Sequence, residues 1–223
     1  AANFSWFKSS SSTIKFGAQI KNLGFLYTNS FNDSLQFEID TKPKEYASFV
    51  KLKYSPSEKF ILEPGIRINL YNVYSDSIFP DLRFGTKYLL TDDRYINFSV
   101  GNYHQFIATF QDDYNPTILD QWIAVDNTVA PAKSSQIVLG YEEYINDLYK
   151  LQVEGYYKDI KNLFTFEESR STTDEAISDT ALSDIVTPSN GYAYGLELFA
   201  QKMSGRLSGW LAYTYSVSRK SMN

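Results

Sequence analysis

KSSQIVLGYEEYINDLYKLQVEGYYKDI, residues 133–160, is the stretch that decides the fold. At its centre, Asn146-Asp147 is a tight-turn signal between two runs in which apolar and polar residues alternate. Successive side chains of a strand point to opposite faces, so Leu151 and Val153 share one face and Gln152 lies on the other. Each arm has about 12 residues, whereas an ordinary globular strand has about 5–6. Long arms, short turns and terminal aromatic residues are typical of the wall of an outer-membrane β-barrel.

The composition of the 223-residue chain fits a barrel and excludes several other classes of protein. Aromatic residues make up 17%, including 18 Tyr and 16 Phe, which fits the aromatic girdles at both interfaces of a membrane barrel. No apolar run approaches the roughly 18 residues of a spanning helix. Cysteine is absent, which excludes disulfides and thiolate–metal sites. A net charge of −5 with both signs interspersed argues against a nucleic-acid partner.

The same alternation recurs in about ten segments of the chain, and their connections alternate between tight turns and long loops. In an antiparallel meander, all short turns then lie at one rim and all long loops at the other. We therefore predict an all-β fold of antiparallel, up-and-down transmembrane β-barrel strands with short periplasmic turns and long extracellular loops. A soluble all-β ligand- or glycan-binding domain is the alternative interpretation.

The alternation also predicts which side chains face the interior of such a barrel. A transmembrane barrel has an apolar outer face and a polar inner face. Charged residues that alternate with apolar ones are therefore predicted to face the lumen, and these are Arg67, Lys87, Glu154 and Glu197.

Three long loops, Asn22–Pro43, Phe106–Ala132 and Lys161–Ser189, are predicted to share one rim. Loops on a rigid scaffold commonly carry binding residues. The middle loop combines flat apolar rings with hydrogen-bonding groups, which suits either a sugar ring or an aromatic chelate; alternatively, it merely caps the barrel mouth. The candidate substrate-facing residues are Phe106, Phe110, Gln111, Asp112, Asp113, Tyr114 and Trp122.

The chain lacks the sequence signals of an enzyme or a cofactor site. Its single histidine, His104, lies at the loop-side end of a predicted strand, and no G-x-S-x-G motif is present. The acidic residues of the middle loop lack the spacing of a calcium-binding loop. We expect no enzymatic activity, no catalytic residues, no cofactor and no metal site.

Several short motifs follow one another over nearly the whole chain. They are EYASFV (45–50), LEPGIR (62–67), PDLRFG (80–85), GNYHQF (101–106), KSSQ (133–136), LGYE (139–142), VEGYYK (153–158), GYAYGLE (191–197) and GWLAYTYS (209–216). In this order the motifs resemble the barrel domain of TonB-dependent outer-membrane receptors, particularly the subgroup with a carboxypeptidase-regulatory-like domain before the plug.

The resemblance implies a larger barrel of about 22 strands with a plugged lumen. About ten strands cannot enclose a plug, so residues 1–223 are expected to form a single partial β-barrel domain without the plug and the terminal strand. A complete small outer-membrane barrel is the alternative.

The resemblance also implies a function, a location and partners. The function is uptake of a scarce nutrient, namely a siderophore, metal chelate, cobalamin or glycan, and the location is the bacterial outer membrane. The implied partners are outer-membrane lipid, the plug domain of the same parent chain, an inner-membrane TonB-type energy-coupling complex and a small-molecule or oligosaccharide substrate, with no nucleic acid.

Overall fold

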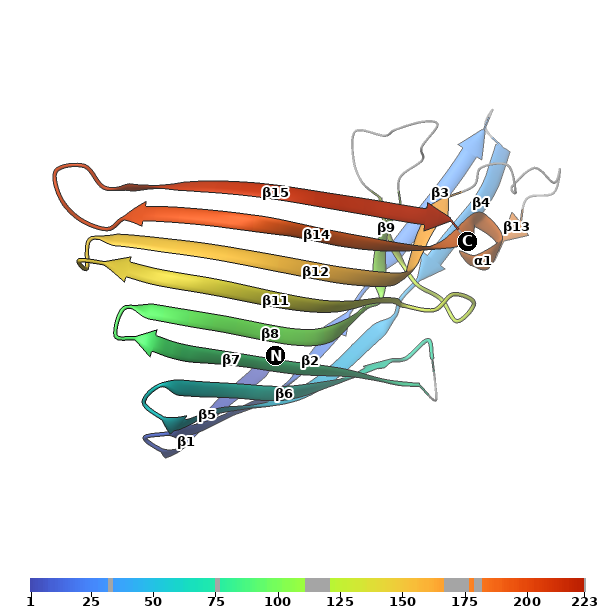
Figure 1. The fold of residues 1–223 in the computed structure, drawn as a ribbon. Coiled ribbons are helices and arrows are strands. Elements are labelled where there is room, and N and C mark those ends of the chain that lie inside the picture. The colour runs from blue at the N-terminus through green and yellow to red at the C-terminus, as the bar shows by residue number, and fades with distance from the viewer. Residues whose placement is uncertain (32–33, 75–76, 111–120, 167–176, 179–181, 223) are drawn as a thin grey trace.

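The computed structural model describes residues 1–31, 34–74, 77–110, 121–166, 177–178 and 182–222. Within these residues, ten strands form one antiparallel sheet in which each strand pairs with its neighbours along the chain (Figure 1). The predicted up-and-down arrangement is therefore confirmed. The ten strands are β1 (Ala2–Ser9), β2 (Ser12–Asn22), β5 (Lys44–Ser57), β6 (Phe60–Tyr71), β7 (Ile78–Thr91), β8 (Arg94–Gln105), β11 (Ala132–Ile145), β12 (Tyr149–Phe166), β14 (Val186–Lys202) and β15 (Gly209–Met222).

The tight turns lie at one end of the sheet, here called the turn-side rim, and the longer connections lie at the other, the loop-side rim (Figure 1). Asn146 and Asp147, between β11 and β12, have φ angles of 52° and 54°. Positive φ at both central residues is the requirement of the type I′ hairpin turn, and Asn and Asp tolerate it better than most residues. The turn signal at the centre of residues 133–160 therefore has a direct structural cause.

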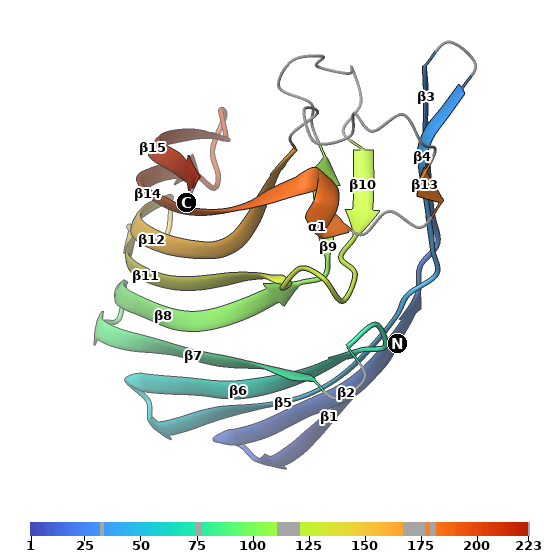
Figure 2. The ribbon, with the colours of Figure 1, turned by 90° about the vertical axis from the view of Figure 1, so that its right-hand side faces the viewer.

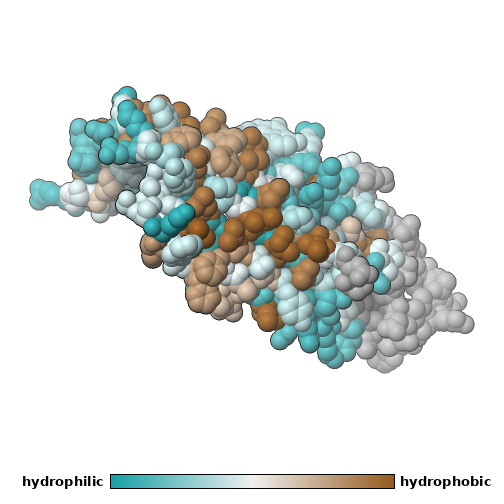
Figure 3. All heavy atoms as spheres, turned by 90° about the horizontal axis from the view of Figure 1, so that it is seen from below, coloured by the Kyte–Doolittle hydropathy of each residue, from teal (hydrophilic) through white to brown (hydrophobic). Residues whose placement is uncertain are grey.

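The sheet is bent into an open trough, with its convex face outward (Figure 2). Cross-strand neighbours carry an apolar row over the convex face: Phe16 pairs with Val50, Val50 with Ile66, and Ile66 with Leu82. All four side chains are exposed. Seen from below, apolar side chains form a broad band with hydrophilic groups toward its ends (Figure 3). Such a band is too large for a water-exposed surface and matches a lipid-facing one.

The three segments predicted as long loops do connect the strands of the sheet at the loop-side rim, and they also contain short strands that the sequence analysis did not predict. The first forms the hairpin β3 (Phe25–Phe31) and β4 (Ser34–Thr41), and the second forms β9 (Ile107–Phe110) and β10 (Gln121–Ala124). In the third, β12 continues to Phe166 and β14 begins at Val186. These segments lack a sustained alternation of apolar and polar residues, so periodicity could not reveal their strands.

A small apolar core closes the loop-side end of the trough. It brings together the end of β6, the segment that includes β9 and β10, and the short helix α1 (Leu182–Ile185) with the start of β14. Its buried members are Tyr71, Phe106, Ile123, Val125, Val129, Leu182 and Val186. Figure 2 shows α1, β9 and β10 on the concave side of the sheet. None of the helical residues in the described ranges forms a helix long and apolar enough to span a membrane.

Candidate functional site

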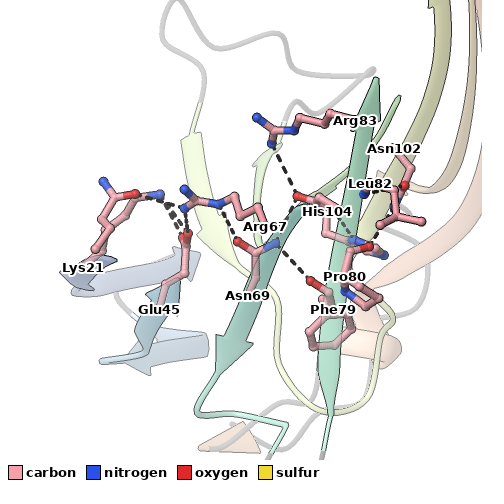
Figure 4. A network of polar contacts seen from close by, with 12 residues as sticks. Lys21, Glu45, Arg67, Asn69, Phe79, Pro80, Leu82, Arg83, Asn102 and His104 are labelled. Atoms are coloured by element: carbon pink, nitrogen blue, oxygen red, sulfur yellow. Dashed lines mark hydrogen bonds and ion pairs between the residues drawn. The ribbon is translucent and has the colours of Figure 1, made fainter. Parts of the chain in front are cut away.

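A chain of polar contacts crosses the concave face near the loop-side rim, beginning at Glu45 (Figure 4). Lys21 Nζ lies 3.1 and 3.0 Å from the two carboxylate oxygens of Glu45, and Arg67 Nη2 lies 3.5 Å from Glu45 Oε1. The Glu45 side chain is buried whereas that of Lys21 is 40% exposed. The three residues come from the adjacent strands β2, β5 and β6.

Arg67 continues the network across the sheet. Its Nε donates to Asn69 Oδ1 at 2.7 Å and its Nη2 donates to Gln19 Oε1 at 3.0 Å. Asn69 Nδ2 donates in turn to Asp81 Oδ2 at 3.0 Å. Because Gln19 and Arg67 lie two strands apart, their contact requires side chains that converge on the concave side. The guanidinium of Arg67 is therefore held in place by the wall itself.

Asp81 is the far end of this network and is almost completely buried. Its Oδ1 lies 2.7 Å from His104 Nδ1, and its Oδ2 lies 3.6 Å from Arg83 Nη2. The guanidinium carbon of Arg83 lies 4.4 Å from the centre of the Tyr103 ring, a cation–π contact. A buried carboxylate is stable only when paired and hydrogen-bonded, and Asp81 meets both conditions.

Strands β7 and β8 separate from each other beside His104. Backbone pairing between β7 and β8 ends at Arg83 and Gly101, although each strand continues to pair with its other neighbour. The side chain of Asn102 fills the gap, donating to the Pro80 carbonyl at 2.9 Å and accepting from the Leu82 N–H at 2.9 Å. This separation lets the chain turn toward the concave side at Phe106 and place β9 and β10 above the polar network.

The network and the hairpin together line a partly enclosed cavity of about 290 Å³. Its polar side is formed by residues of β2 and β5 to β8, and Trp122 of β10 belongs to its lining. The lining includes three cationic side chains, Lys21, Arg67 and Arg83, and two carboxylates, Glu45 and Asp81. We call this feature the rim cavity. A cleft lined by charged groups and aromatic rings is suited to a small polar ligand with an apolar ring.

The structure describes three of the seven candidate substrate-facing residues, Phe106, Phe110 and Trp122. Trp122 is 59% exposed and lines the rim cavity. Phe106 also belongs to the lining of the rim cavity, but its ring is buried against Tyr71 and Phe79, with ring centres 4.7 and 5.1 Å away. Phe110 is the last residue of β9. The remaining candidates, Gln111, Asp112, Asp113 and Tyr114, lie outside the described residues.

The four residues expected in the lumen lie on one face of the sheet. Lys87 pairs with Asn97, Asn97 with Gly140, Gly140 with Glu154, and Glu154 with Glu197, which forms a single row. Arg67 pairs with Asp81, six residues from Lys87 along β7 and therefore on the same face. Glu142, two residues after Gly140 on β11, forms ion pairs with Lys87 at 3.4 Å and with Lys150 at 3.5 Å.

Sequence reasoning did not single out most of the rim cavity. Lys21, Glu45, Asn69 and Asp81 were missed, and His104 was noted only as a rim residue. The first four stand at alternate positions that place them on the Arg67 face. That alternation could be read from the sequence. Nothing in the sequence showed that these side chains, which come from neighbouring strands, lie side by side at the same level of the sheet.

The loops at this rim are joined to one another. Tyr74 Oη donates to the Val129 carbonyl, and burial, followed by the charge of Asp126, raises the pKa of Tyr74 to about 12. Asp126 accepts from the Thr128 N–H at 2.8 Å and from the Leu182 N–H, at the start of α1, at 2.7 Å. Parallel pairing of Ile177 and Ser178 (β13) with β4 joins the third segment to the first.

Replacing Asp126 should loosen this connection without affecting the sheet. Asp126→Ala removes the acceptor for the Leu182 N–H, and the loss of such a cap costs about 1 kcal/mol. Hydrogen exchange of residues 182–186 is expected to become faster, while β11 and β12 keep their protection. Asp93→Ala, in an exposed turn at the opposite rim, is the control and should change neither. Unchanged exchange in Asp126→Ala would show that the loops are held by other contacts.

Ten antiparallel strands with an apolar convex face and a charged concave face define the chain as a segment of a transmembrane β-barrel wall. The family model for the TonB-dependent receptor-like β-barrel matches residues 2–223, and the chain belongs to this family. It is a family of outer-membrane receptors and transporters rather than of enzymes. A search among curated protein sequences finds no match.

Several solved structures have the same fold as this chain. The chain is similar to the FrpB iron transporter from Neisseria meningitidis (F3-3 variant), with 10% identity and a TM-score of 0.67 over 98% of this chain and 34% of that one. It is similar to the siderophore receptor PirA from Pseudomonas aeruginosa, with 12% identity and a TM-score of 0.68. This match covers 98% of this chain and 41% of PirA. It is also similar to the copper transporter OprC, with 15% identity and a TM-score of 0.60. This match covers 95% of this chain and 36% of OprC. The chain thus spans about a third to two fifths of these proteins.

Proposed function

We propose that this chain forms part of the barrel of a TonB-dependent receptor that takes up a scarce nutrient across the bacterial outer membrane. The observation that carries the proposal is the two-sided sheet: an exposed apolar row on the convex face and a charged network on the concave face. In water the convex face would be a large unprotected apolar surface, whereas in a bilayer it is solvated by lipid.

In this proposal, residues 1–223 are one partial barrel domain. β1 and β15 form the two ends of the ten-strand sheet, and the similar structures are two to three times longer than this chain. Further strands of the parent protein would pair with these two edges and complete the barrel. The concave face would then surround the plug domain, and an inner-membrane TonB-type complex would supply the energy for transport.

The rim cavity is the part of this wall that we assign to substrate recognition. It lies at the loop-side rim, which the proposed orientation places outside the cell, and it combines the exposed ring of Trp122 with charged groups. The substrate is a siderophore, a metal chelate, cobalamin or a glycan. Among the similar proteins, the names of FrpB, PirA and OprC give iron, a siderophore and copper.

A growth experiment tests the uptake function. The gene for the intact receptor is deleted and restored, and growth is measured with one limiting nutrient at a time: ferric chelates, copper, cobalamin or oligosaccharides. Restoration should rescue growth on one nutrient, and removal of the TonB-type partner should abolish the rescue. A restored strain whose growth does not depend on that partner would contradict energy-coupled uptake.

The soluble alternative has its own test. An intact parent protein that purifies without detergent as a single monodisperse species would favour a soluble ligand-binding domain. We expect it instead in the outer-membrane fraction, soluble only in detergent.

A further inference from the structure

The acceptors in the rim cavity are largely satisfied, whereas some donors are not. Both oxygens of Glu45 accept from Lys21, and Arg67 adds a third contact. Asp81 is contacted by His104 on one oxygen and by Asn69 on the other. A carboxylate surrounded in this way has little capacity left to bind a hydroxyl or an ammonium group from a ligand.

Arg83 is the principal unsatisfied donor. Its only polar contact within the described part of the chain is the 3.6 Å ion pair with Asp81, which is too long for a good hydrogen bond. Its side chain is 45% exposed, and stacking on Tyr103 restrains the guanidinium. Figure 4 shows the Arg83 side chain apart from the Lys21–Glu45–Arg67 group, joined to the network only by its ion pair. A guanidinium has five N–H donors, and most of these are available.

Lys21 adds a second cation at the other end of the cavity. Two of its three N–H donors are used by Glu45, which leaves one for another acceptor. With three cationic side chains against two carboxylates, the lining carries a net charge of +1 before His104 is counted. A partly enclosed site of this sign attracts anions more strongly than the same charges would in open water.

We propose that the rim cavity binds an anionic oxygen group of the substrate, such as a carboxylate, with Arg83 as its main partner and the ring of Trp122 against a flat apolar part of the same ligand. The inference rests on the proposed uptake function and narrows its substrate class, because a neutral glycan would leave the half-exposed guanidinium of Arg83 with only its long ion pair to Asp81. A fork of parallel N–H groups matches the two oxygens of a carboxylate.

The test compares an anionic probe with its neutral analogue on the intact, detergent-solubilised receptor. Binding of 1-naphthoate and of 1-naphthamide is measured by ligand-observed NMR saturation transfer. Naphthoate is expected to bind more tightly than naphthamide. Arg83→Gln should weaken naphthoate binding about tenfold or more, because a charge-assisted contact is lost. It should leave naphthamide unchanged, and Arg83→Lys should restore part of the loss. Added salt should weaken only the naphthoate complex.

Arg94→Gln is the matched control. Arg94 is also paired with a carboxylate, Glu143, at 2.9 Å, but it lies at the turn-side rim. The control should bind both probes like the parent receptor. Equal affinity of the two probes, no binding of naphthoate, or an unchanged naphthoate affinity in Arg83→Gln would each overturn the inference.

The two proposals fail separately. Growth rescue by an uncharged nutrient, together with equal binding of both probes, would overturn the anion site and leave uptake intact. Arg83-dependent naphthoate binding by a receptor that rescues growth on no nutrient would overturn uptake alone.

Discussion

Phe106→Ala should release the β9–β10 hairpin from the wall while the ten-strand sheet persists. Phe106 is 3% exposed, stacked on Tyr71 at 4.7 Å and edge-to-face with Phe79 at 5.1 Å. Truncating a fully buried Phe costs about 3–5 kcal/mol, because contacts are lost and a cavity remains. The loop-side core is small, so a loss of this size exceeds what its other contacts can offset. Hydrogen exchange of residues 107–110 and 121–124 in the intact receptor is expected to become much faster.

Trp122→Ala is the control for this change. It removes a larger ring from the same hairpin, but one that is exposed. We expect hydrogen exchange in the hairpin to stay nearly as slow as in the parent receptor, with ligand binding weakened. The opposite result, in which Phe106→Ala leaves the hairpin protected and abolishes only ligand binding, would return Phe106 to the substrate-facing role that its sequence suggests.

A second large effect is expected from a charge on the convex face. Leu139 lies near the middle of β11, between Phe98 and Gly155 on the adjacent strands, and its side chain is 58% exposed. In the proposed barrel it contacts the bilayer centre, where Arg costs about 2–4 kcal/mol. Leu139→Arg should therefore lower the free energy of unfolding of the receptor in lipid vesicles by that amount, as measured by denaturant titration.

The neighbouring residue provides a matched control. Val138 points to the opposite face, where it lines a second concave cavity of about 330 Å³ together with Lys87 and Glu154. Val138→Arg is expected to cost much less, because the new charge faces a polar cavity in which two carboxylates, Glu63 and Glu154, lie beside two lysines. Equal penalties for the two variants would mean that the convex face does not contact lipid.

The sequence by itself determined the sheet. A strand repeats every two residues, so an alternating pattern specifies both the strand and the side of the wall to which each residue belongs. Turn signals such as Asn146-Asp147 then set the register of each hairpin through local backbone geometry alone. The number of strands in the ten-strand sheet and the face of each residue could be predicted because alternation depends only on residues close together in the chain.

Only the tertiary structure decided how the loop-side rim is built. The parallel pairing of β13 with β4 and the contact of Asp126 with Leu182 join residues far apart in the sequence, and the hairpin β9–β10 packs against the end of β6. None of these contacts leaves a periodic signal, because each segment has its own irregular surroundings. The pairing of Asp81 with His104 likewise depends on the separation of β7 from β8, which a single side chain, Asn102, fills. These contacts form only because the whole sheet is curved. The curvature directs side chains from five strands, β2 and β5 to β8, toward the same cavity.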